Sequence, residues 1–268
     1  AVIGLGSLYR IASLRGGGAV VAAQMGGTFV PEDTGDPSLR RLRNVVEEIS
    51  IASGVPVPKL FVLEQEAGIN AFAAGYSPAD AAITVTHGAL QTLNRDELQG
   101  VIGHEFSHIL AGDMRINIRM IGVLGGVLVL GLVGVRILQF GGRGKNKGGG
   151  QILLFGVAAM VLGFVGQFLA GLIKAAVSRQ REWLADAAAI QFTRQSAGLA
   201  GALKKIAGLP EGSALADARS EKQVSHMLFG AGRGSILALW DTHPPLEERI
   251  RALDPTFGPE QAQALRER

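Results

Sequence analysis

The chain of 268 residues carries 26 lysines and arginines against 23 acidic residues, and a net charge of +3 is too small to indicate a nucleic-acid partner. It has no cysteine, which excludes disulfides and thiolate metal ligands. Hydrophobic residues make up 47% of the chain and glycine is abundant, a composition that favours membrane segments over an ordinary soluble enzyme. None of these totals predicts an oligomeric state.

Residues 1–37 are expected to be an N-terminal membrane-proximal segment and linker. Residues 1–30 are apolar and rich in glycine, and residues 1–8 suit either the end of a membrane helix or an ordinary buried segment. Residues 31–37 are polar and begin and end with proline, which is typical of a loop.

The next elements predict an amphipathic helix and a small β-sheet. Residues 38–54 place apolar side chains along one stripe, and Gly54 suits the C-terminal stop. Residues 59–64 and 81–86 are expected to be strands, with residues 68–75 forming a third short strand or an extended turn between them. An edge strand of this sheet could bind an extended peptide through backbone hydrogen bonds, or the sheet could simply support the helix that follows.

Residues 94–112 predict that helix. Asn94 is a suitable N-cap residue, and Glu97 three positions later completes a capping box. Apolar side chains then recur at helical spacing.

Within this helix the chain reads His104-Glu105-Phe106-Ser107-His108, the pattern H-E-x-x-H. Side chains four residues apart share a helix face, so His104 and His108 can present two imidazoles to one metal ion. Glu105 can reach a water molecule on that metal without being a ligand, which is the arrangement of a zinc peptidase. The alternative is two core histidines and a chance glutamate, and the coincidence of pattern, cap and periodicity disfavours it.

Residues 116–177 predict a transmembrane helical hairpin. Residues 120–135 and 152–173 contain no charged side chain, and a basic, glycine-rich loop separates them. A spanning helix needs roughly 20 apolar residues, which the second segment supplies and the first nearly supplies. The alternative is a buried hairpin in a soluble protein. Basic residues flank both ends about equally, so the positive-inside rule does not orient the hairpin.

A tetrahedral catalytic zinc needs a third protein ligand, which must here be histidine, aspartate or glutamate. Asp113 lies five residues past His108 on the same predicted helix, which points it away from the shared face. Glu182 and Asp186 lie four residues apart just after the second apolar segment. We assign Glu182 to the metal because its side chain reaches further, and Asp186 to the orientation of a ligand imidazole. The alternative is a surface pair of acids.

Four blocks of this sequence resemble the HtpX-like family of integral-membrane zinc endopeptidases, which includes the eukaryotic CAAX prenyl endoprotease. They are residues 70–73 (Asn-Ala-Phe-Ala), 104–108 (His-Glu-Phe-Ser-His), 182–186 (Glu-Trp-Leu-Ala-Asp) and 242–249 (Thr-His-Pro-Pro-Leu-Glu-Glu-Arg). The resemblance runs from about residue 39 to residue 253. It implies an α+β, mostly helical, gluzincin-type catalytic domain with a small β-sheet and an inserted transmembrane hairpin.

The resemblance also implies an integral protein of the cell membrane whose active site faces the cytoplasm and whose role is membrane-protein quality control. It places His243 and Asn70 near the metal, where they would bind the developing oxyanion or the substrate backbone. A structural or capping role for His243 is the alternative. We therefore expect one zinc metalloprotease domain at residues 38–268, interrupted by the hairpin at 116–177.

The function predicted from these residues is hydrolysis of peptide bonds in polypeptide substrates at a membrane. His104, His108 and Glu182 would hold Zn²⁺, and Glu105 would act as general base on the metal-activated water. One alternative is an intramembrane protease, although charged residues surround the motif here. The other is a membrane scaffold or chaperone-like protein stabilised by zinc, in which Glu105 would have no role.

Overall fold

The computed structural model describes residues 17–140, 149–209, 212–213, 228–229 and 243–266. The expectations for residues 1–16 and for most of the basic hairpin loop lie outside these ranges. The chain divides into two compact units. One contains Ile116–Ala176, and the other joins Gly16–Arg115 with Val177–Arg268.

The second unit is built around a four-stranded mixed sheet with the order β1-β2-β4-β3. The strands are β1 (Thr28–Phe29), β2 (Lys59–Leu63), β3 (Ala71–Ala74) and β4 (Ala82–Thr86). β2 and β4 are parallel, whereas β1 and β3 run antiparallel to their neighbours. The two predicted strands match β2 and β4, and the segment expected to be a short strand or an extended turn contains β3. β1 was not predicted, because two residues are too few to show an alternating pattern.

Both faces of this sheet are covered, which explains why almost every residue of β2, β3 and β4 is buried. Side chains alternate between the faces of a strand. Leu60, Ala73 and Ile83 accordingly join the main core, whereas Phe61, Phe72 and Ala82 face the helix α2 (Gly17–Gln24). α2 and β1 precede residue 38 and pack with this unit, and the predicted division at residue 37 stays a prediction.

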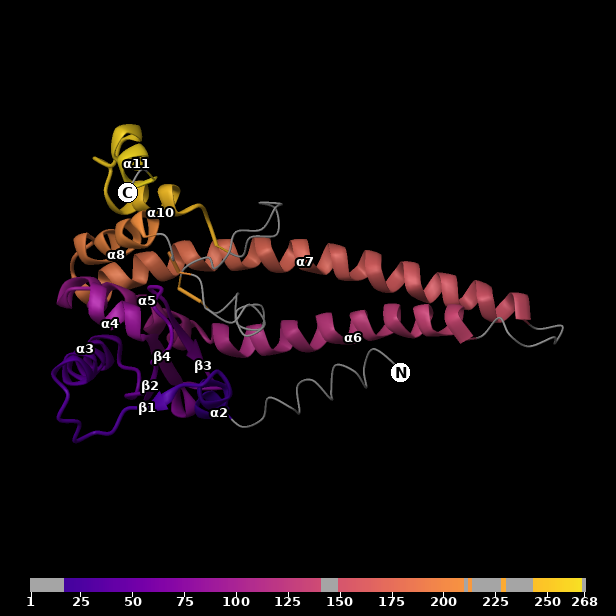
Figure 1. The fold of residues 1–268 in the computed structure, drawn as a ribbon, viewed down its shortest axis with the longest axis horizontal. Coiled ribbons are helices and arrows are strands. Elements are labelled where there is room, and N and C mark those ends of the chain that lie inside the picture. The colour runs from indigo at the N-terminus through magenta and orange to yellow at the C-terminus, as the bar shows by residue number, and fades with distance from the viewer. Residues whose placement is uncertain (1–16, 141–148, 210–211, 214–227, 230–242, 267–268) are drawn as a thin grey trace. The chain divides into compact units, whose positions relative to one another are not determined.

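The main core lies between the sheet and a group of helices (Figure 1). The central helix α5 (Arg95–Ala111) contacts α3 (Pro37–Ser53), α8 (Ala197–Gly208) and β3. α3 begins one residue before the predicted start, where Asp36 caps the helix through the backbone N–H groups of Ser38 and Leu39. It ends at Ser53, with Gly54 at its C-cap as predicted. Among the described residues, this unit also contains α4 (His87–Thr92), the 3₁₀ turn Pro78–Asp80, the end of α7 (Gly149–Thr193), α10 (Leu246–Leu253) and α11 (Pro259–Arg266).

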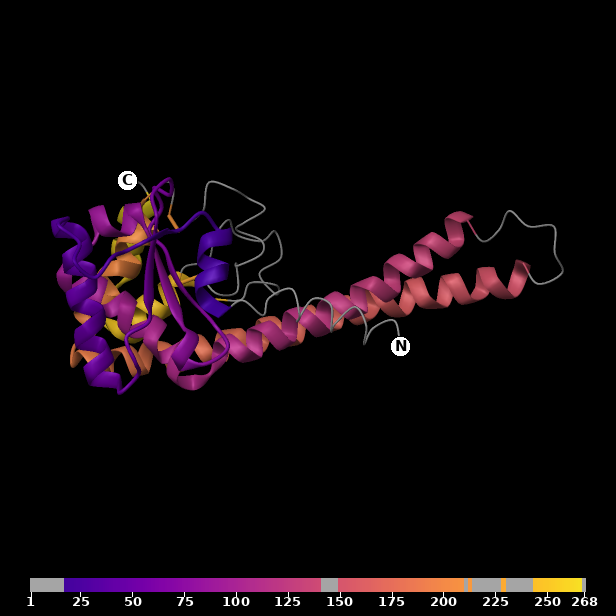
Figure 2. The ribbon, with the colours of Figure 1, turned by 90° about the horizontal axis from the view of Figure 1, so that it is seen from below.

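The other unit is a pair of long helices that run side by side (Figure 2). They belong to α6 (Asp113–Phe140) and α7 (Gly149–Thr193). Glycine allows close approach, because a Cβ on Gly163 would lie 2.2 Å from the backbone nitrogen of Gly131. Large apolar side chains such as Leu154 and Leu162 are 71% and 65% exposed. By length and composition, both helices could cross a membrane.

Candidate metal centre

The helix α5 carries the H-E-x-x-H motif and begins at a complete capping box. Asn94 Oδ1 accepts the N–H of Glu97 at 2.9 Å, and Glu97 Oε2 accepts the N–H of Asn94 at 2.7 Å. Lys205 on α8 donates to the same Glu97 oxygen at 2.7 Å, which fixes α5 against its neighbour. Both predicted cap residues therefore hold the start of the helix that presents His104 and His108.

The two imidazoles and the Glu182 carboxylate converge on one point. His104 Nε2 and His108 Nε2 are 3.1 Å apart, and the Glu182 oxygens lie 3.6 and 3.5 Å from them. Two tetrahedral zinc ligands at ordinary bond lengths are roughly 3.4 Å apart. These three groups also form the only cluster in the described part of the chain that could hold a metal ion. Their spacing and their donor set both fit Zn²⁺.

An aspartate lies behind each imidazole. Asp186 Oδ1 is 2.9 Å from His104 Nδ1, and Asp113 Oδ2 is 2.8 Å from His108 Nδ1. An Nδ1–H that donates to a carboxylate leaves Nε2 with its lone pair free for a metal.

The expectation that Asp113 would point away from this face was wrong. α5 ends at Ala111, and Gly112 adopts φ 73°, in the left-handed region. Asp113 thus starts the next helix, and the change of chain direction returns its side chain to His108.

Arg249 is the most buried charged residue behind the centre. Its Nε and Nη2 donate to the two oxygens of Asp186 at 2.8 and 2.7 Å, and its Nη1 lies 3.3 Å from Glu182 Oε2. Nη1 also donates to the Phe229 carbonyl at 3.1 Å. Burial by itself raises the pKa of Asp186, but the Arg249 charge and the hydrogen bonds from His104 and Arg249 together outweigh it and lower that pKa. The carboxylate behind His104 is therefore kept ionised.

His243 lies beside the third predicted ligand. Its Nδ1 is 2.9 Å from Glu182 Oε2, and its side chain is 3% exposed. Burial alone raises the pKa of Glu182, but the charges of His243 and His104, together with hydrogen bonds from His108 and His243, outweigh it and hold the pKa well below its usual value. Glu182 is thus an ionised carboxylate, the form that binds metal.

Glu105 is buried next to the centre, and both of its carboxylate oxygens lack a hydrogen bond of ordinary geometry to the described residues. Burial raises the pKa of Glu105 to about 7, and the Glu182 charge adds to the rise. A carboxylate with a pKa near neutrality can both accept and return a proton.

Asn70 lies at the start of β3, where its amide groups hold the local backbone. Nδ2 donates to the Ser213 carbonyl at 2.5 Å, and Oδ1 accepts the N–H of Ala71 at 2.9 Å. These bonds fix the entry into β3, and a catalytic role for Asn70 stays a prediction.

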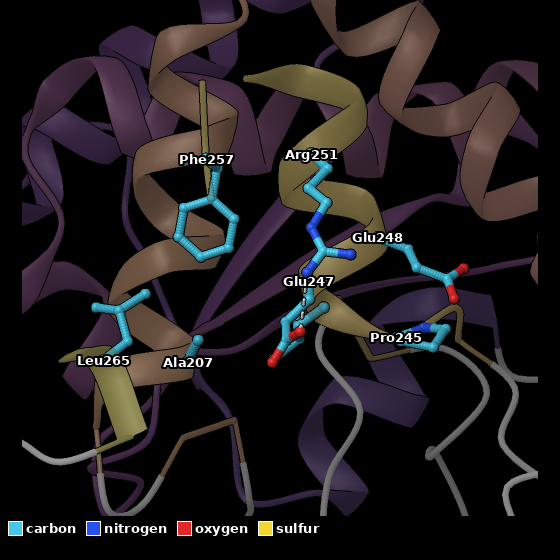
Figure 3. A pocket seen from close by; sticks show the side chains of 8 residues that line it. Ala207, Pro245, Glu247, Glu248, Arg251, Phe257 and Leu265 are labelled. Carbon is cyan, nitrogen blue, oxygen red and sulfur yellow. Dashed lines mark hydrogen bonds and ion pairs between the residues drawn. The ribbon is translucent and has the colours of Figure 1, made fainter. Parts of the chain in front are cut away.

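A separate cavity of about 430 Å³ lies among α8, α10 and α11 (Figure 3). Its lining is Ala207, Pro245, Leu246, Glu247, Glu248, Arg251, Phe257 and Leu265. Figure 3 shows Phe257 and Leu265 on one side and Arg251 with Glu247 on the other. None of these residues belongs to the cluster of His104, His108 and Glu182.

Sequence reasoning did not find Arg249, and it did not find Arg181, whose Nη1 pairs with Asp113 Oδ1. It also misplaced Asp113. Arg249 lay within the quoted block of residues 242–249, but nothing local shows that its partner is Asp186, 63 residues away. For Asp113, Gly112 was a visible signal, because glycine often ends a helix and changes the chain direction.

The model of peptidase family M48 matches residues 38–256 of this chain. The chain belongs to peptidase family M48. It is 40% identical over 217 residues to a protease HtpX homolog of Caldanaerobacter subterraneus subsp. tengcongensis, covering 79% of this chain and 70% of that protein. It is 34% identical over 256 residues to a protease HtpX homolog of Leuconostoc citreum, covering 93% and 83%.

Among solved structures, the crystal structure of S. mikatae Ste24p has a similar fold, with a TM-score of 0.55 at 17% sequence identity. The match covers 92% of this chain and 56% of that one, so this chain spans little more than half of its length. The predicted HtpX-like and CAAX protease family is confirmed. This member of family M48 is a metalloendopeptidase, mostly helical with a small mixed sheet, and its two apolar helices indicate membrane association.

Proposed function

We propose that this chain is a membrane-anchored zinc endopeptidase of the gluzincin type that hydrolyses peptide bonds in misfolded or membrane proteins. The spacing of 3.1–3.6 Å among His104 Nε2, His108 Nε2 and the Glu182 oxygens carries the proposal. These three residues would hold Zn²⁺. When bound, the metal supplies a Lewis acid that lowers the pKa of water and polarises the scissile carbonyl.

The other residues position groups or move a proton. Glu105 accepts a proton from the attacking water and then delivers it to the leaving amine, a transfer that its raised pKa favours. Asp186 holds His104 in one tautomer and orientation. His243 and Asn70 are assigned to the developing oxyanion or to the substrate backbone.

The outer edge of β3 supports binding of an extended peptide. Asn70 accepts the N–H of Thr86 on β4, so alternate residues of β3 direct their backbone groups toward β4. Ala71 and Ala73 then face outward, and Phe229 already donates to the Ala71 carbonyl at 2.8 Å. Leu228 forms an antiparallel bridge with Phe72 beside this bond, so the outer edge of β3 accepts a further extended strand. Backbone pairing tolerates many sequences, which suits a protease of misfolded proteins.

The variant Glu105→Gln tests the mechanism. It should still bind Zn²⁺ and should lose cleavage of casein by about a hundredfold or more, because an amide cannot accept the proton. Glu47→Gln is a matched control on the exposed surface of α3 and should keep full activity. Full activity of Glu105→Gln would contradict the proposed base.

The wild-type protein also distinguishes this proposal from the two alternatives, a zinc-stabilised scaffold and an intramembrane protease. A scaffold stabilised by zinc would bind partner proteins and cleave none, with or without a chelator. An intramembrane protease would cut a model membrane protein inside its apolar segment, whereas this proposal expects cleavage outside it. Mapping the cut sites by mass spectrometry distinguishes these outcomes.

A cytoplasmic catalytic unit is the orientation that the resemblance to HtpX-like proteases supports. Because the chain has no cysteine, single cysteines can report the topology directly. We expect Gln151→Cys, at the start of α7, to react with an impermeant thiol reagent outside intact cells. Thr256→Cys should react only after lysis, and the reverse pattern would contradict the orientation.

A further inference from the structure

Asp113 and Arg181 form an ion pair directly behind His108. Asp113 Oδ2 is 2.8 Å from His108 Nδ1, and the other oxygen of Asp113 pairs with Arg181 Nη1. Asp113 is 6% exposed and Arg181 is 29% exposed, so the contact lies at the edge of the core. His108, Asp113 and Arg181 thus form a chain of imidazole, carboxylate and guanidinium. His104, Asp186 and Arg249 form the same kind of chain.

We propose that Asp113 and Arg181 are positioning residues for the metal ligand His108. The inference rests on the proposed zinc site. Asp113 holds the Nδ1–H of His108, which fixes the tautomer and aims Nε2 at the metal. Arg181 holds Asp113 in the rotamer that makes this bond.

The chain leaves His108 in need of such support. His108 is three residues from the end of α5 at Ala111, and its side chain is 17% exposed, whereas His104 is fully buried. A partly exposed imidazole near a helix end can rotate about its side-chain bonds unless a second group holds the ring. Carboxylates behind a metal-bound histidine serve this purpose, and their loss typically weakens metal binding by about 10–100-fold.

The first test is the zinc affinity of the full chain in detergent, measured by competition with a chelator. Asp113→Asn keeps the shape of the side chain and removes its charge. We expect it to weaken Zn²⁺ binding by about tenfold or more. The unfolding temperature of the metal-free protein should change little, because the partner charge of Arg181 is partly exposed and stays solvated by water.

Arg181 is tested by a double-mutant cycle with Asp113. Arg181→Met alone should weaken Zn²⁺ binding less than Asp113→Asn does. Arg181→Lys keeps the positive charge and should bind Zn²⁺ more tightly than Arg181→Met. The double variant should bind no more weakly than Asp113→Asn, because Arg181 acts through Asp113. Arg251→Met is the matched control, since Arg251 pairs with Glu247 on the surface of α10 and should leave zinc affinity unchanged.

Loading with Co²⁺ adds a readout that a purely structural role would not move. The visible absorption of bound Co²⁺ depends on ligand geometry, so Asp113→Asn should alter it even at saturation. Wild-type zinc affinity in Asp113→Asn, an unchanged cobalt spectrum, or a loss of affinity matched by a fall in metal-free stability would each overturn the inference. Additive losses in the cycle would overturn the role of Arg181. A wild-type protein that binds no Zn²⁺ would overturn the proposed function itself.

Discussion

The two imidazoles of the candidate metal centre have the same kind of support in different surroundings. Behind His104, Asp186 and Arg249 are fully or almost fully buried, and Arg249 also contacts Glu182 and the Phe229 carbonyl. Behind His108, Asp113 is buried but Arg181 is partly exposed. The inner pair, Asp186 and Arg249, therefore stabilises the folded state as well as the metal site. The outer pair, Asp113 and Arg181, can be changed with little effect on the stability of the unit.

Arg249→Met should break the inner pair with the largest effect. It leaves Asp186 and Glu182 buried without their cation, and the loss of one partner from a buried ion pair costs about 3–5 kcal/mol. We expect a fall in the unfolding temperature of the metal-free protein of about 10 °C or more. Scanning calorimetry measures this unfolding temperature. Adding Asp186→Asn should recover part of the loss, and an unchanged unfolding temperature would contradict the role given to this arginine.

Asp186→Asn should have the next largest effect and can be compared directly with Asp113→Asn. Both variants should bind Zn²⁺ more weakly. Only Asp186→Asn should also destabilise the metal-free protein by several degrees, because it leaves the Arg249 charge incompletely paired in the core. Equal effects of the two variants on stability would remove the distinction between the inner and outer pairs.

Raising the ionic strength should affect the outer pair more than the inner pair, and this difference should be smaller than the effects above. Salt screens exposed charges over a Debye length of about 10 Å at 0.1 M and about 3 Å at 1 M. The difference in zinc affinity between the wild type and Arg181→Met should therefore shrink as KCl is raised. The difference between the wild type and Asp186→Asn should persist, and a parallel decline of both would show that both pairs are screened alike.

The partly exposed ion pair of Lys204 and Asp254 lies away from the metal centre and extends the comparison, with the smallest expected effect. Hydrogen bonds from Lys204 and Thr256 lower the pKa of Asp254 to about 2, below its value in the unfolded chain. The stabilisation is present above pH 4 and is lost as the pH falls toward 2. Asp254→Asn should remove this small pH dependence from the unfolding temperature and leave zinc affinity unchanged. A change in zinc affinity would show that surface pairs also act on the centre.

The sequence alone was sufficient for the features that depend on local physics. The capping box of Asn94 and Glu97, the period of α5 and the strands β2 and β4 all follow from residues close together in the chain. The H-E-x-x-H spacing places both histidines on one helix face for the same reason. The length and apolarity of the two hairpin helices also follow directly from the sequence.

Only the tertiary structure decided which distant side chains meet at the centre. His104 and Asp186 are 82 residues apart, and Asp186 and Arg249 are 63 apart, so no periodicity relates them. The folded chain also decides how buried each pair is, since the same kind of aspartate–arginine pair is enclosed behind His104 and partly exposed behind His108. Asp113 shows the limit of local reasoning, because the left-handed conformation of Gly112 reverses where that side chain points.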